Sequence, residues 1–98
     1  MATLFTFYKF LLYFSLLPAA TEVSGIILDK FNNEPLANVY IYAVKGEEET
    51  LSNDKGGFKL LSWEALPLTV VFEKKGYKPV RVPVKKEQKN FKVILEAY

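Results

Sequence analysis

The side chains on which most hydrolases and metalloenzymes depend are missing from this chain, because its 98 residues include no histidine and no cysteine. Their absence excludes Ser-His and Cys-His nucleophile systems, an imidazole general base, the usual zinc sites and disulfide bonds. The densest group of carboxylates is the run Glu47–Glu49. Adjacent side chains in one loop diverge, so we expect a solvated loop there, with a weak calcium site as the alternative. We predict no catalytic residue, no metal site, no cofactor and no enzymatic activity.

Tyr40, Tyr42 and Trp63 are the residues that could support binding. The two tyrosines share one face of an expected strand, 39–44, whose odd-numbered residues we assign to the core. Aromatic side chains on the outer face of a sheet can stack on sugar rings or anchor a protein interface. The alternative is structural: the tyrosines fill the other side of the sheet under a loop, and Trp63 closes one end of the core.

The charge of the chain is nearly balanced, with 13 basic and 11 acidic residues and a net charge of +2. Basic residues nevertheless gather between Lys74 and Lys92, where Glu87 is the one acid. We interpret most of them as solvated faces and as protection of sheet edges, with attraction to an acidic partner or to membrane headgroups as the alternative. Base-stacking aromatics are not interleaved with these lysines, so we expect no nucleic-acid partner.

Residues 1–20 differ from the rest of the chain. Lys9 and the free amine precede an apolar run over 10–17, and two small residues end the segment, which is the layout of a secretory signal peptide. We predict a cleaved signal over 1–20 and a folded domain over 21–98, with an uncleaved N-terminal anchor as the alternative. The anchor would be the protein's contact with a membrane. We therefore expect an exported protein of the periplasm, outer membrane or cell surface.

The remaining residues alternate between short strands and turns, with about seven strands at the spacing of a β-sandwich. No stretch keeps a 3.6-residue period, so we expect an all-β fold without crossover helices. Gly25 marks a bulge or a close approach of two backbones. Pro79 and Pro83 share a parity, so one side of their strand lacks two donors and the strand should lie at an edge or be interrupted by bulges. Besides 39–44, the expected strands include 23–28, 68–73, 80–84 and 90–95.

The stretch 50–60 predicts a β-hairpin around which the chain is organised. Polar residues from Ser52 to Lys55 favour a turn, and Gly56 and Gly57 can take positive φ at little cost. Apolar and polar residues alternate on either side, so we expect a type I turn closed by a glycine bulge, with Phe58 buried beneath it. The structural turn residues are therefore Asn53, Gly56, Gly57 and Phe58, with a flexible loop as the alternative.

Four ordered motifs resemble the carboxypeptidase regulatory-like domain family over nearly all of 21–98. The motifs are Val23-x-Gly25-x-Ile27-x-Asp29, Asn33-Glu34-Pro35-Leu36-x-x-Val39, Thr50-x-Ser52-Asn53-x-x-Gly56-x-Phe58-x-Leu60 and Gly76-Tyr77. Asn53 stands where the family usually has Asp. The resemblance implies a transthyretin-like, seven-stranded Greek-key β-sandwich in an exported protein. It implies a binding or scaffolding role and transfers no catalytic residue.

The function that we predict is a non-catalytic, exported module that binds or scaffolds another envelope protein. One alternative is the N-terminal extension of a TonB-dependent outer-membrane nutrient receptor, of which this chain would be a truncated part. Another is a carbohydrate-binding module, which would need exposed, coplanar aromatic rings.

Overall fold

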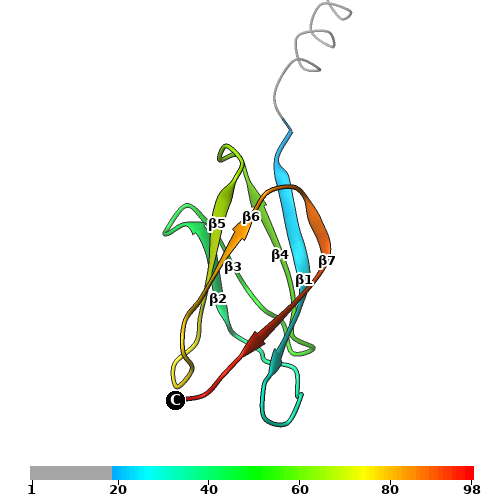
Figure 1. Ribbon diagram of the computed structural model, residues 1–98, viewed down its shortest axis with the longest axis vertical. Helices are drawn as coiled ribbons and strands as arrows, with labels where there is room; N and C mark the ends of the chain where they lie inside the picture. The colour runs from blue at the N-terminus through cyan, green and yellow to red at the C-terminus, as the bar shows by residue number, and fades with distance from the viewer. Residues whose placement is uncertain (1–18) are drawn as a thin grey trace, which may run out of the picture.

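A computed structural model of the chain describes residues 19–98, which form seven β-strands in two sheets (Figure 1). The two sheets confirm the expected all-β sandwich, while the predicted signal segment over 1–20 lies almost wholly outside the described residues. The strands are β1 (Thr21–Asp29), β2 (Tyr40–Val44), β3 (Glu48–Leu51), β4 (Gly57–Ser62), β5 (Leu68–Glu73), β6 (Val80–Val84) and β7 (Gln88–Leu95).

The order of the strands shows which of them lie at sheet edges. The three-stranded sheet has the order β4-β1-β7, and the four-stranded sheet has the order β3-β2-β5-β6. The strands pair antiparallel except β1 and β7, which pair in parallel. β6 is an edge strand, as Pro79 and Pro83 predict, because a proline nitrogen cannot donate to a neighbouring strand.

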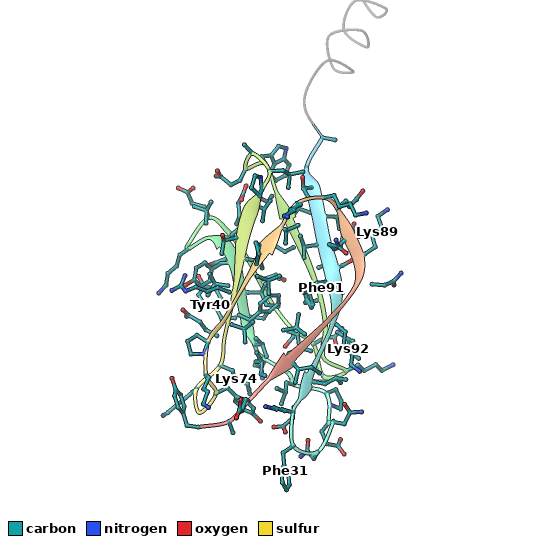
Figure 2. The ribbon with its side chains drawn as sticks, viewed as in Figure 1. Phe31, Tyr40, Lys74, Lys89, Phe91 and Lys92 are labelled. Atoms are coloured by element: carbon teal, nitrogen blue, oxygen red, sulfur yellow. The ribbon has the colours of Figure 1, made fainter. Side chains whose placement is uncertain are left out.

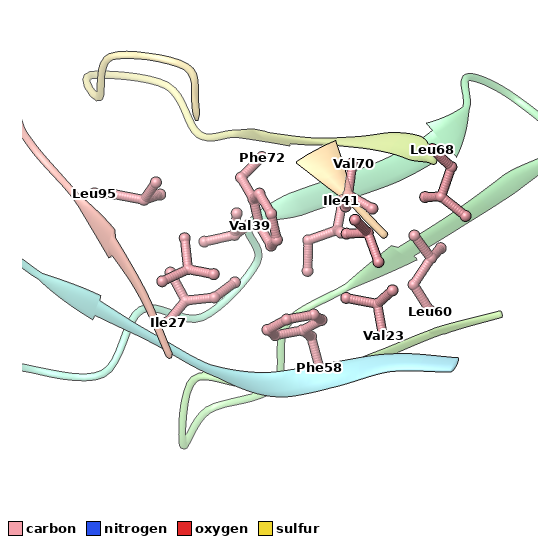
Figure 3. Close-up of a cluster of buried hydrophobic side chains, with 12 residues drawn as sticks. Val23, Ile27, Val39, Ile41, Phe58, Leu60, Leu68, Val70, Phe72 and Leu95 are labelled. Atoms are coloured by element: carbon pink, nitrogen blue, oxygen red, sulfur yellow. The ribbon is translucent and has the colours of Figure 1, made fainter. Parts of the chain in front are cut away.

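The core lies between the inner faces of the two sheets (Figure 3). Ile41 of β2 and Val39, just before this strand, are fully buried, which confirms that the odd-numbered residues face the core. Phe58 packs edge-to-face on Phe72, with ring centroids 5.3 Å apart. The buried hydrophobic cluster comprises Val23, Ile27, Val39, Ile41, Phe58, Leu60, Leu68, Val70, Phe72, Val84, Val93 and Leu95.

Gly25 lies at a close approach of the β1 and β7 backbones. The register of this pair shifts between Val23 and Gly25, so the predicted bulge is present. A Cβ added to Gly25 would overlap the carbonyl oxygen of Phe91 and lie 2.6 Å from its carbonyl carbon. The predicted close approach is present as well, and it requires a residue without a side chain.

The stretch 50–60 contains the predicted turn, but the prediction that its two flanking strands pair with each other is wrong. β3 pairs with β2, and β4 pairs with β1, so the turn connects two different sheets. Gly56 has a φ of 76° and donates its N–H to the Asn53 carbonyl at 2.9 Å. Gly57 is not in the positive-φ region. The turn is also bound to β1, since the Ile27 N–H donates to the Gly56 carbonyl at 2.8 Å.

The acidic run Glu47–Glu49 is only in part the solvated loop that the sequence predicts, because Glu47 alone lies in an exposed turn. Glu48 and Glu49 belong to β3, because they pair with Val44 and Tyr42 of β2. The Glu48 carboxylate accepts hydrogen bonds from the Ser62 hydroxyl at 2.6 Å and from the Trp63 N–H at 2.8 Å. Pairing with the preceding strand, β2, which local charge density does not reveal, determines this conformation.

Asp29 closes the loop that follows β1. One carboxylate oxygen accepts the N–H groups of Phe31 at 2.7 Å and Asn32 at 3.2 Å, and the other accepts the Tyr77 hydroxyl at 2.5 Å. The hydrogen bond from Tyr77, followed by that from Phe31, lowers the pKa of Asp29. Asp29 thus joins two loops at the end of the sandwich.

We expect Tyr77→Phe to lower the melting temperature at pH 7, because it removes one donor from a nearly buried carboxylate. A depressed carboxyl pKa contributes stability above its unfolded value, near 3.8, and this contribution is lost as pH falls through the lower folded value. The difference between the variant and the wild type should therefore shrink in acid. Thermal melts from pH 7 to pH 2 measure it, with the exposed Tyr98→Phe as control. A difference that stays constant with pH would show that the effect does not depend on the ionised Asp29 carboxylate.

Candidate functional site

Tyr40 and Tyr42 lie side by side on the outer face of the four-stranded sheet. Both are half-buried, and their ring centroids are 5.0 Å apart with the ring planes tilted by 40°. Figure 2 shows Tyr40 on the side of the sandwich opposite β7. Val71 pairs with Tyr42 and is 4% exposed although it belongs to the outer face, so this face is partly covered by its own side chains.

The two tyrosine hydroxyls are engaged by carboxylates from neighbouring strands. Tyr42 donates to Glu73 of β5 at 2.9 Å, and Tyr40 donates to Glu49 of β3. These hydrogen bonds are the largest cause of the raised pKa of each tyrosine. The sequence does not reveal Glu49 and Glu73 as partners, because only the strand register places them beside the tyrosines.

The tyrosine pair forms a polar aromatic patch. Lys45 lies 5.8 Å from the centroid of the Tyr42 ring, which adds a cation to one side. The rings are tilted and half-buried, whereas stacking on a sugar needs exposed faces in one plane. This geometry does not favour the carbohydrate-binding alternative.

Trp63 lies in the connection between β4 and β5 and is 64% exposed, so it does not close an end of the core. Its backbone N–H binds Glu48, whereas the next residue of β3, Glu49, binds Tyr40. Successive residues of a strand point to opposite faces, so Trp63 and the tyrosine pair lie on different sides of β3. The structure therefore does not join the three predicted binding residues into one surface.

The predicted turn residues hold the chain rather than a ligand. The Asn53 side-chain oxygen accepts the N–H groups of Lys55 at 3.0 Å and Gly57 at 2.9 Å. Phe58 is 7% exposed and belongs to the core. These contacts explain why short polar residues and glycine occupy this turn.

A shallow hollow crosses the outer face of the three-stranded sheet and reaches the edge of β3. Ile26 and Leu51 are apolar residues of its lining, which also includes Lys59 and Lys89. Lys59 pairs with Glu22 at 3.6 Å, so part of its charge is balanced within the domain. The hollow offers an apolar and basic surface, and no catalytic group lines it.

Residues 19–98 contain no group of three or more acidic, histidine or cysteine side chains that could hold a metal ion. Within the same range no helix is long and apolar enough to cross a membrane.

Comparisons with known proteins identify the family of the fold. The CarboxypepD_reg-like domain model matches residues 23–97. Two solved structures of interface mutants of a type II cohesin-X-dockerin complex from Acetivibrio cellulolyticus are similar, with TM-scores of 0.62 and 0.61 and identities of 18% and 17%. Each match covers 79% of this chain and 58% of the solved chain. No curated protein matches.

Proposed function

This chain belongs to the CarboxypepD_reg-like domain family, and we propose that it serves as a non-catalytic protein-interaction module exported to the cell envelope. The observation that carries the proposal is the family match over 23–97, which runs from β1 to beyond the end of β7. The matched region is therefore the folded domain itself. A role in binding agrees with the two similar structures, which are parts of a protein complex.

The side-chain contacts support a non-catalytic role. Asp29, Glu48, Glu49 and Glu73 each accept hydrogen bonds that join separate strands or loops. A general acid or base needs a carboxyl group aimed at a substrate in a desolvated pocket. These four carboxylates are instead used to hold the sandwich together.

Export is supported by the sequence of residues 1–20, with its basic start, apolar run and small residues. Mass spectrometry of the protein from a secreting host should find a mature chain that begins near Thr21. Full-length protein that remains in the cytoplasm would count against export and would leave the interaction role untouched.

Affinity capture tests the interaction role. Residues 21–98, tagged at the C-terminus, are used as bait in an envelope extract, with excess untagged domain as competitor. We expect a protein that is recovered in near-stoichiometric amount and displaced by the competitor. Panels of ester, peptide and glycoside substrates are assayed with the same preparation and should show no turnover. Saturable turnover that a single carboxylate substitution abolishes would overturn the proposal.

A further inference from the structure

The outer edge of β7 is a long row of backbone groups at the margin of the three-stranded sheet. Within residues 19–98, β1 is the one strand that pairs with β7. β7 has eight residues and no proline, whereas the other edge strand on this side of the sandwich, β6, contains Pro83. Proline and short length protect many edge strands, and β7 has neither, so its protection consists of the exposed lysines Lys89 and Lys92.

Two contacts show which backbone groups of β7 face outward. The Phe91 carbonyl lies against Gly25, and the Leu95 carbonyl accepts the Lys30 N–H at 2.9 Å, so both residues direct their polar groups toward β1. In a parallel pair, alternate residues point to opposite sides of the strand. Lys92 and Ile94 therefore direct their N–H and C=O groups to the outer edge.

The continuation of the same edge already accepts an antiparallel segment. The Glu96 carbonyl accepts the Lys78 N–H at 2.9 Å, and the Tyr98 N–H donates to the Gly76 carbonyl at 3.1 Å. These bonds flank an antiparallel bridge between Tyr77 and Ala97. An added strand beside Lys92 and Ile94 would continue the antiparallel pairing that Tyr77 makes with Ala97.

The surroundings of the edge determine which strand fits. On the inner side, Val80, Val82 and Phe91 are half-buried hydrophobic residues at the margin of the core, and β6 and β7 stand further apart than β3 and β4. On the outer side, Lys89 and Lys92 are exposed, and the ion pair of Lys89 with Glu87 at 3.9 Å is itself solvent-exposed and therefore weak. Figure 2 shows Phe91 directed into the sandwich and Lys89 directed away from it.

We propose that the outer edge of β7 binds an extended segment of a partner protein as an added antiparallel strand, with apolar side chains facing inward and acidic side chains beside Lys89 and Lys92. The segment gains main-chain hydrogen bonds from Lys92 and Ile94 and specificity from the alternating side chains. A second copy of β7 fits poorly, because it would bring four lysines to one seam. This inference rests on the proposed interaction role and names its surface.

A synthetic peptide tests the site directly. The probe is a capped, eight-residue peptide of alternating valine and glutamate, with the valine-lysine peptide as control. Binding to residues 21–98 is followed by NMR, together with amide hydrogen exchange. We expect the valine-glutamate peptide to slow amide hydrogen exchange at Lys92 and Ile94. The valine-lysine peptide should bind at least about tenfold more weakly. A peptide N-methylated at alternate residues should lose binding, because it cannot donate to the edge.

Ile94→Pro removes one outward donor and keeps the pairing with β1, so it should weaken binding about tenfold while the circular dichroism spectrum stays native. Lys89→Glu/Lys92→Glu should reverse the preference between the two peptides. Lys85→Glu/Lys86→Glu, in the turn before β7, carries the same charge change and should retain the preference. Trp63→Ala should bind as the wild type does.

Three results would overturn the site: no binding of the valine-glutamate peptide, slowed exchange on another surface, or unchanged affinity in a folded Ile94→Pro variant. A dimer that forms with rising concentration and disappears in Ile94→Pro would replace the partner segment with a second copy. An envelope protein that captures wild type and Ile94→Pro equally would support the interaction role and reject the β7 edge. Peptide binding at the β7 edge without any captured envelope protein would support the edge as a strand-binding site and count against the interaction role.

Discussion

Gly25→Ala should prevent folding of the domain. The added Cβ would overlap the Phe91 carbonyl oxygen and lie 2.7 Å from the Phe91 nitrogen, so a backbone rather than a movable side chain stands in its way. Relief requires β1 and β7 to separate at the bulge, which breaks the pairing that holds β7 in its sheet. Substitutions that disrupt a structure in this way cost more than about 4 kcal/mol. A small domain has about 5 kcal/mol of total stability.

Gly46→Ala is the matched control for this prediction. Gly46 has a φ of 83°, but a Cβ there would meet no atom within 4 Å. Strain of the left-handed backbone alone costs about 1–2 kcal/mol, so this variant should fold with a lower urea midpoint. Circular dichroism and urea unfolding measure both variants. If Gly25→Ala folds with the stability of Gly46→Ala or better, β1 and β7 do not approach as closely as the structure shows.

The parts of the fold that depend on local patterns could be predicted from the sequence. The expected strand 68–73 agrees with β5 at both ends, because Leu68, Val70 and Phe72 alternate with polar or outward residues. The edge position of β6 follows from the parity of its prolines. In both cases the necessary information lies within a few neighbouring residues.

The parts that depend on pairing between distant residues could not be predicted. Residues 50–60 carry the turn signal of a hairpin, but the partner of each flanking strand lies elsewhere in the chain, so the turn links two sheets. The Glu73 partner of Tyr42 could not be predicted for the same reason. Glu73 is more than thirty residues from Tyr42 in the sequence and reaches it through the pairing of β2 with β5.

Position in the sheet order also explains why the β7 edge escaped sequence analysis. The sequence predicts that its lysines protect an edge, which agrees with the exposed positions of Lys89 and Lys92. The sequence does not reveal that Lys92 and Ile94 direct their backbone groups outward, since this depends on the contacts of Phe91 and Leu95 with β1 and the loop after it. Whether the odd- or the even-numbered residues of a strand direct their backbone groups outward can be decided only when one neighbouring strand is known.

Phe58→Ala should come close to unfolding the domain at room temperature. The Phe58 ring is 7% exposed and packs edge-to-face on Phe72, which is fully buried, so its removal leaves a cavity between the two sheets. Truncation of a buried phenylalanine costs about 3–5 kcal/mol. With a urea m-value of about 1–3 kcal/mol/M, the urea midpoint should fall by about 2 M. Loosening of the turn before Phe58 should add little to this free-energy cost, because the turn is bound by the Asn53 side chain and by β1.

Phe31→Ala removes the same side chain from a position that is 97% exposed and is therefore the matched control. A surface substitution of this kind changes stability by less than about 0.5 kcal/mol, so its urea midpoint should equal that of the wild type. The pair separates the loss of core packing from the loss of a phenylalanine as such. If the two variants unfold at the same urea concentration, Phe58 does not join the two sheets, and the turn before it does not place a core residue.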